Sequence, residues 1–155
     1  MANEQLVARL GATRAYFEKT IACFEDEDGA FAPAEGMFNV AQHIAHAAQT
    51  IEWFLEGAFR PNGLNLDFAA LEQEVRDIKE MEDARAWWDS ALDQTLESVA
   101  GSAPESWAEP IRGELMGGMP REAIFGGIAD HTAHHRGALA VYARLCGREP
   151  AMPYV

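Results

Sequence analysis

The sequence predicts an all-α fold, a four-helix bundle in a single domain that covers residues 1–155. Two observations lead to this prediction. Several long segments repeat apolar residues at spacings of three and four, which places them on one face of an α-helix. No segment shows the alternation of apolar and polar residues that is typical of a half-buried strand. Helices with such faces bury them against one another, so the fold class follows.

The first helix is predicted over residues 3–26. Its apolar face consists of five residues: Leu6, Leu10, Phe17, Ile21 and Phe24. The acidic run 25–28 and Gly29 should end this helix, because carboxylates are unfavourable at a helix C-terminus and glycine is a common stop. The run lacks the ligand spacing of an EF-hand, so we interpret it as a solvated helix end rather than a calcium site.

The second helix is predicted over residues 40–59, after a loop that contains Gly and Pro. Asn39 is suited to cap it, with Gln42 as the partner in a capping box. Apolar residues occupy most of its circumference. We therefore expect this helix to be central and covered on more than one side.

Three segments separate the second helix from the last one. A turn at residues 60–66 leads to an additional short helix over 67–80, capped by Asp67. A longer helix follows over residues 82–100. The segment 101–119 is rich in Gly, Pro and Ser, and a loop of this length inside a domain is often functional. We expect it to fold over a site or to carry a short hairpin.

The last helix is predicted over residues 120–146, opened by Pro120 and ended by Gly147. Its inward seam has alternating spacings of four and three: Ile124, Ile128, His131, His135, Ala138, Tyr142 and Leu145. Glycine costs about 1 kcal/mol relative to alanine inside a helix. We therefore expect three internal glycines to allow a close approach of helices: Gly126, Gly127 and Gly137.

All five histidines lie in two short stretches, His43 and His46 in the second helix and the other three in the last. His131 and His135 are one turn apart on the seam, where two imidazoles can chelate one ion. A pair of core histidines satisfied by hydrogen bonds is the alternative. The second histidine pair, on a neighbouring helix, favours metal binding over this alternative. The third ligand would be His43 or His46. Periodicity places His43 nearer the apolar stripe but leaves the choice open.

The composition excludes several classes of function. A net charge of -13 repels nucleic-acid phosphates and anionic lipid. No apolar run approaches the roughly 20 residues that span a bilayer. The first residues lack the basic and apolar regions of a signal peptide. Cys23 and Cys146 match no metal or redox spacing. We expect them to be reduced thiols in a cytoplasmic protein.

Residues 38–46 and 131–137 are similar to two motifs found together in one family. Residues 38–46 resemble an aromatic-Ser-x-x-Glu-x-x-x-His pattern, with Asn39 in place of Ser and Gln42 in place of the acidic residue. Residues 131–137 resemble a His-x-x-x-His-Arg-Gly pattern. With these motifs and its order of helices, nearly the whole chain resembles the DinB/YfiT-like superfamily of metal-binding four-helix bundles.

The resemblance implies an up-down-down-up order of the helices and a metal held by three histidines: His46, His131 and His135. His43 then becomes a residue of the pocket, and His134 is expected to pack beside the site. These two are the candidates for acid–base catalysis. Arg136 is the candidate for binding an anionic group of a substrate or cofactor, although pairing with an acidic neighbour on the surface is the favoured alternative.

Three neutral imidazoles leave open positions on a divalent ion, as in catalytic rather than structural sites. We expect zinc or nickel first, with iron and manganese as alternatives, because all of them accept imidazole ligands. The resemblance implies a metal-dependent transferase or isomerase that uses a low-molecular-weight thiol, or a hydrolase, acting on a small-molecule substrate. The alternative is a non-enzymatic, stress-associated metal-binding protein. The apolar second helix and the tail 150–155 predict a homodimer.

Overall fold

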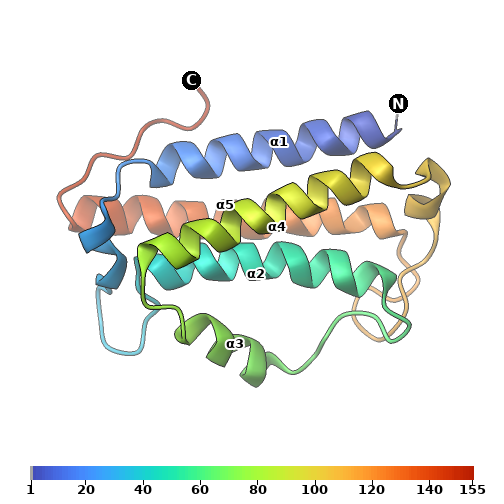
Figure 1. The fold of residues 1–155 in the computed structure, drawn as a ribbon, viewed down its shortest axis with the longest axis horizontal. Coiled ribbons are helices and arrows are strands. Elements are labelled where there is room, and N and C mark those ends of the chain that lie inside the picture. Colours follow the sequence, from blue (N-terminus) through green and yellow to red (C-terminus); the bar gives the residue numbers. More distant parts are fainter. Residues whose placement is uncertain (1) are drawn as a thin grey trace.

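The computed structural model describes residues 2–155, and it confirms the all-helical fold (Figure 1). The helices are, in chain order, α1 (Ala2–Ile21), α2 (Val40–Phe59), α3 (Phe68–Arg76), α4 (Met81–Gly101) and α5 (Ile124–Leu145). Three short 3-10 turns accompany them: η1 (Asp26–Ala30), η2 (Pro104–Ala108) and η3 (Arg121–Ala123). Among residues 2–155, no helix has the length and apolar character needed to cross a membrane.

The four long helices form the bundle, and their directions give the up-down-down-up order that the resemblance implied (Figure 1). α1 and α5 run one way, and α2 and α4 run the other way. α2 packs against α4 and α5, and α1 packs against the same two helices. α2 and α4 are neighbours that run in the same direction. After the end of α2, the chain therefore has to travel back along the bundle before α4 begins. α3 makes this return along the outer side of α2.

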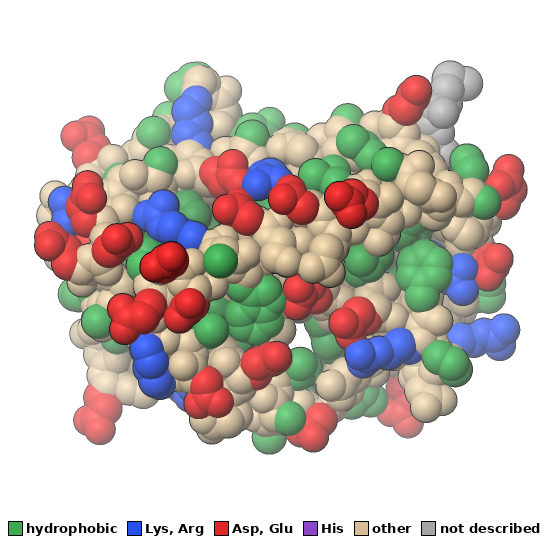
Figure 2. Space-filling view, viewed as in Figure 1, with side chains coloured by type: hydrophobic (Ala, Val, Ile, Leu, Met, Phe, Trp, Pro, Cys, Tyr) green, Lys and Arg blue, Asp and Glu red, His purple; other side chains and the backbone are tan. Residues whose placement is uncertain are grey.

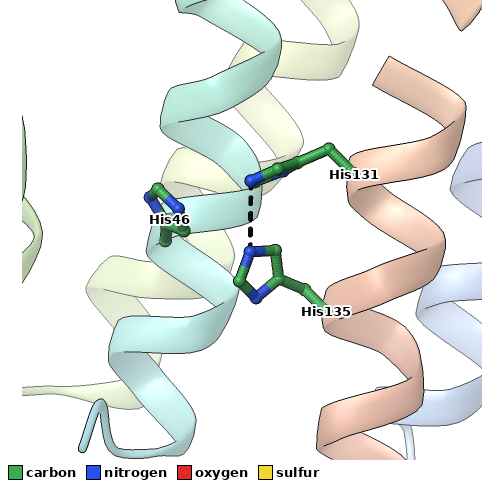
Figure 3. A group of neighbouring side chains, drawn as sticks. All are labelled: His46, His131 and His135. Atoms are coloured by element: carbon green, nitrogen blue, oxygen red, sulfur yellow. Dashed lines mark hydrogen bonds between the residues drawn. The ribbon is translucent and has the colours of Figure 1, made fainter. Parts of the chain in front are cut away.

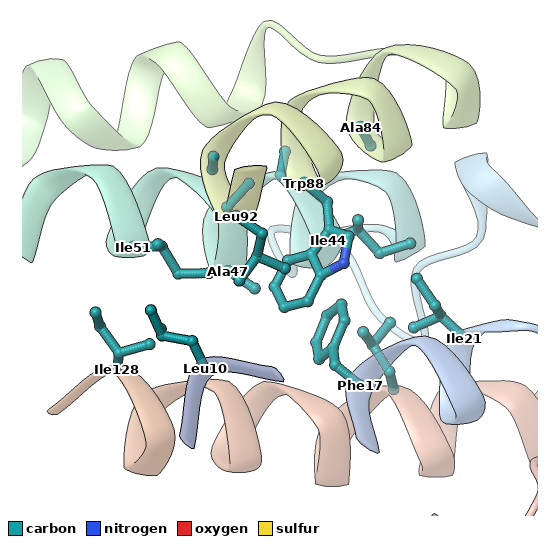
Figure 4. Packing of buried hydrophobic residues seen from close by; sticks show 14 of the residues in the cluster. Leu10, Phe17, Ile21, Ile44, Ala47, Ile51, Ala84, Trp88, Leu92 and Ile128 are labelled. Carbon is teal, nitrogen blue, oxygen red and sulfur yellow. The ribbon is translucent and has the colours of Figure 1, made fainter. Parts of the chain in front are cut away.

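The core lies between the four long helices α1, α2, α4 and α5, where large side chains interlock (Figure 4). The rings of Phe17 and Trp88 stack with centroids 4.1 Å apart. Ile44 and Ile51 of α2 have no exposed surface. The helices around α2 and turn η1 cover its apolar circumference within one chain. This explains one of the two observations that suggested a homodimer, and the dimer itself stays a prediction.

Local capping signals set the start of α2 as predicted. Asn39 Oδ1 accepts the Gln42 backbone N–H at 2.8 Å, and Gln42 Oε1 accepts the Asn39 N–H at 3.1 Å. Asp67 caps α3 in a similar way, accepting from the Ala70 N–H at 3.1 Å. The reciprocal bonds at Asn39 fix the first turn of α2. They thereby set the directions in which His43 and His46 leave that helix.

The acidic run is solvated as predicted at residues 25–27, but it is not a helix end. α1 ends at Ile21, and the run forms turn η1 instead. Asp28 is buried, and its Oδ2 accepts from Arg148 Nε at 2.8 Å. A buried carboxylate needs such a partner. The partner lies at the other end of the chain, so no local pattern announces it.

The last helix also differs in detail from the prediction. Pro120 precedes η3, and α5 itself begins at Ile124. Leu145 is 58% exposed and does not belong to the core seam. A Cβ at Gly127 would lie 2.5 Å from Phe54 Cζ, so the close approach expected there is confirmed. The same prediction is wrong for the two other glycines, which have no such neighbour within 4 Å: Gly126 and Gly137.

Candidate metal centre

Three histidines from two helices meet where α2 faces α5 (Figure 3). His46 comes from α2, and His131 and His135 come from successive turns of α5. One ring nitrogen from each residue lies within 4.8 Å of the others. The Nε2 atoms of His131 and His135 are 3.2 Å apart. Imidazole nitrogens gathered in this way are suited to share one divalent ion.

A chain of hydrogen bonds sets the tautomer of His135. The Tyr142 hydroxyl donates to the Phe38 carbonyl oxygen at 3.1 Å, so it can only accept from His43 Nε2–H, also 3.1 Å away. The lone pair of neutral His43 is then on Nδ1, which accepts from His135 Nδ1–H at 3.0 Å. This leaves the Nε2 lone pair of His135 facing His131, which is the arrangement that a metal ligand requires.

A second chain sets the tautomer of His46. The side-chain amide of Gln49 donates from Nε2 to the Leu71 carbonyl oxygen at 2.9 Å and to Glu74 Oε2 at 2.6 Å. These bonds direct Gln49 Oε1 toward His46 Nδ1, 3.4 Å away. His46 therefore carries its proton on Nδ1, and its Nε2 has the free lone pair. Each of the two hydrogen-bond chains therefore leaves one Nε2 atom free to bind an ion, that of His135 or that of His46.

His131 completes the fit to a cation. Its Nδ1 is buried and has no hydrogen-bond partner among the described residues. Buried imidazoles are normally hydrogen-bonded, so the function of this ring lies at its Nε2. A lone pair at that atom would face the lone pair of His135 Nε2 at 3.2 Å. A proton or a cation between them removes the repulsion. The donor set of three imidazoles fits a divalent ion that accepts nitrogen ligands.

Burial keeps these imidazoles neutral at pH 7. Together with the neighbouring histidines, it lowers the pKa of His43 and of His131 to about 4. For His135, burial and the adjacent His131 lower the pKa to about 2. Burial also lowers the pKa of His46. Only the neutral form of imidazole can bind a metal, so the four rings are already in the form that a metal site needs.

A cavity of about 600 Å³ opens beside the histidines. Its lining comes from α2, α3, α5 and the residue before α2's cap: Phe38, His46, Gln49, Thr50, Trp53, Phe54, Phe68, Leu71, Glu72, Arg76 and His131. Trp53 forms part of this wall.

The segment 101–119 was expected to fold over a site or to carry a short hairpin, and the structure confirms the hairpin. None of its residues lines the cavity, whereas the Ile111 N–H donates to the Met119 carbonyl oxygen at 2.8 Å beside an antiparallel bridge between Pro110 and Pro120. The segment packs on the far end of α2, where Trp107 contacts Phe59 with ring centroids 5.3 Å apart.

The other candidate residues lie around the centre rather than in the cavity. His43 is buried behind His135 and is bonded at both ring nitrogens. His134 is exposed, and its ring centroid lies 4.9 Å from that of His135 in an edge-to-face arrangement. Arg136 donates to the Tyr154 hydroxyl at 2.6 Å, and its guanidinium carbon lies 5.6 Å from the centre of the Tyr16 ring. It contacts tyrosines where an acidic partner was expected.

The sequence did not identify the residues that orient the ligands. Tyr142 was assigned to the core seam. The spacing of apolar residues gives no information about its hydroxyl group, which bonds His43. Gln49 was not singled out, although its place one turn after His46 is a usable signal. Glu74 comes from α3, and only the packing of that helix brings it to Gln49.

Tyr142→Phe should weaken metal binding about 10- to 100-fold, because it removes the acceptor that fixes His43 and, through it, His135. The change keeps the ring and its packing. Competition with a chromophoric chelator measures the affinity. Tyr154→Phe is the matched control, since Tyr154 is exposed and bonds Arg136. Equal affinities for the two variants would contradict the tautomer chain.

Comparisons with known proteins agree with this fold. A sequence model of the DinB superfamily matches residues 9–139. A solved structure with a similar fold is that of YfiT from Bacillus subtilis, described as a probable metal-dependent hydrolase with an unusual four-helix bundle topology. The two share 12% sequence identity and superpose with a TM-score of 0.69 over 94% of this chain and 87% of that one. No curated protein matches the chain.

Proposed function

The chain belongs to the DinB superfamily, and on this premise we propose that it is a divalent-metal-dependent enzyme that acts on a small organic molecule. The proposed ligands are the three clustered histidines: His46, His131 and His135. The observation that carries the proposal is that the free lone pairs of neutral, oriented imidazoles converge at the wall of a cavity.

The cavity favours an enzyme over the alternative of a non-enzymatic protein with a structural ion. A structural zinc site is closed by four protein ligands, whereas a catalytic site keeps a position open. Among residues 2–155, the candidate ligand group has three members. Two of them, His46 and His131, also line the cavity, so a molecule inside it lies against the proposed centre.

The residues have distinct roles in this proposal. When bound, the ion supplies Lewis acidity that lowers the pKa of a water or thiol reaching it. Gln49 and His43 hold two ligand rings in the required tautomers. Because both nitrogens of His43 are engaged within the protein, it is a positioning residue and not a base. Glu72 is the carboxylate of the cavity lining, and it is the residue that we propose to accept a proton.

The proposal includes finer predictions from the sequence. We propose zinc or nickel as the native ion, and water or a low-molecular-weight thiol as the nucleophile. A cytoplasmic location and a homodimer remain predictions as well. A molecular mass measured by light scattering at micromolar concentration tests the dimer.

Metal removal tests the function. Untagged protein is assayed as purified, after chelation, and after the ion is restored. One set of assays offers uncharged esters to water, and a second offers uncharged electrophiles with glutathione. We expect turnover in at least one set, lost on chelation and recovered with the ion. Equal rates in all three states would remove the ion from the mechanism. Stoichiometric metal with no turnover in either set would favour the non-enzymatic alternative.

A further inference from the structure

The cavity beside the histidines has the size and lining of a site for a small organic molecule. Its volume of about 600 Å³ is typical of such sites. Five of its lining residues have large apolar side chains: Phe38, Trp53, Phe54, Phe68 and Leu71. His46 and His131 also line the cavity. An apolar wall with a few polar groups orients a ligand that has one reactive end.

Aromatic rings dominate this wall, and one of them is held rigidly. The indole N–H of Trp53 donates to the Asn65 carbonyl oxygen at 2.7 Å, so the ring needs no further polar partner. Its centroid lies 4.9 Å from that of Phe54 and 6.4 Å from that of Phe68. Such rings bind another ring by offset or edge-to-face contacts. Phe68 is 58% exposed, which places an apolar side chain at the edge of the cavity.

The charges of the lining do not attract an ionic ligand. Arg76 pairs with Glu72 at 2.8 Å, donates to the Gly36 carbonyl oxygen at 3.1 Å and lies over the ring of Phe38 at 4.8 Å. Its charge is therefore already engaged within the protein. Acidic side chains are spread over the face shown in Figure 2, and the chain carries a net charge of -13. This field repels anions.

We propose that the cavity binds an uncharged small molecule with an aromatic or other apolar ring, oriented with its reactive group toward His46 and His131. That the group facing the two histidines reacts is an inference that rests on the proposed function. The binding itself depends on the apolar wall and does not need an ion.

Two dyes that differ by one sulfonate test the proposal on chelated protein. N-phenylnaphthylamine is uncharged, and anilinonaphthalenesulfonate is its anionic counterpart. We expect the uncharged dye to bind at least about tenfold more tightly, because the sulfonate would lose its hydration in an apolar site. Fluorescence titration measures both affinities. Equal binding, tighter binding of the sulfonate, or no binding of either dye would overturn the proposal.

A pair of matched variants locates the bound dye. Phe68→Asp places a carboxylate at the edge of the cavity, and it should fold, since Phe68 is the first residue of α3, where a negative charge is favourable. It should lower the affinity for the uncharged dye about tenfold or more, a loss of about 1.4 kcal/mol or more. Leu115→Asp changes an exposed leucine outside the lining and should leave the affinity unchanged. Equal losses would place the dye elsewhere.

The two proposals fail in different ways. If the cavity does not bind the uncharged dye, metal stoichiometry and chelator-sensitive turnover can still be observed. If no ion binds, the dye titrations on chelated protein keep their expected result. Each measurement therefore overturns only its own proposal.

Discussion

His135→Ala should abolish stoichiometric binding of a divalent ion, whereas His134→Ala should leave it unchanged. His135 presents an oriented lone pair to the cluster, and His134, its neighbour in the chain, is exposed and outside the group of candidate ligands. Elemental analysis of untagged protein, purified without metal-affinity chromatography, measures the stoichiometry. We expect about one ion per chain for the parent protein and for His134→Ala, and close to none for His135→Ala.

Thermal unfolding gives an independent measure of the same prediction. A ligand that binds only the folded state at 100 times its Kd adds about 2.7 kcal/mol to the free energy of unfolding. Added zinc or nickel should therefore raise the Tm of the parent protein and of His134→Ala, but not that of His135→Ala. Unchanged stoichiometry in His135→Ala would overturn the site.

The same assay separates the two histidines of α2. His46→Ala should remove the ion, because His46 belongs to the ligand group. His43→Ala should weaken binding without removing it, because His43 contacts His135 and not the cavity. The reverse result would show that the third ligand is His43. Circular dichroism of each variant checks that a lost ion does not reflect a lost fold.

Lowering the pH below 6.5 should destabilise the metal-free protein. Histidine has an ordinary pKa of 6.5, and burial lowers the pKa of His43 and of His131 to about 4 in the folded protein. Between these values the unfolded chain binds more protons than the folded one. The free energy of unfolding therefore decreases as the pH falls. The stability is complete above pH 6.5 and is lost toward pH 4.

The expected loss is on the order of 1 kcal/mol per pH unit for each buried histidine. Urea unfolding of chelated protein, at intervals from about pH 7.5 to about pH 4.5, measures it. His131→Ala removes one of the titrating groups and should show a shallower dependence. A free energy of unfolding that is constant down to pH 5, or a variant slope equal to that of the parent, would contradict the burial of neutral imidazoles.

Local signals were sufficient for most of the fold. The capping residues Asn39 and Gln42 stand at the start of the periodic segment that they cap, and α2 has the predicted bounds. The end of α1 was missed because the Asp28 carboxylate is held in turn η1 by a local bond from the Glu25 backbone N–H and by a distant one from Arg148. Asp28 and Arg148 are 120 positions apart in the chain. Periodicity reports which way a side chain faces within its own helix and carries no information about such a partner.

The candidate site shows the same division between local and distant information. His131 and His135 are one turn apart in α5, so their spacing alone paired them. The choice between His43 and His46 depended on what lies against each face of α2. His46 faces the cavity under α3, and His43 faces Tyr142. Periodicity distinguishes buried from exposed faces, and it cannot distinguish one covered face from another.

The position of α3 has a consequence for how such a protein changes over evolutionary time. α3 packs mainly on α2, outside the bundle, and Val75 is its fully buried residue. It nevertheless supplies Phe68, Leu71 and Glu72 to the cavity. Substitutions on surface helices usually cost little stability. Sequence drift in this helix can therefore alter the choice of ligand while the bundle and its histidines stay intact, which makes α3 the natural segment for diversification and for directed evolution.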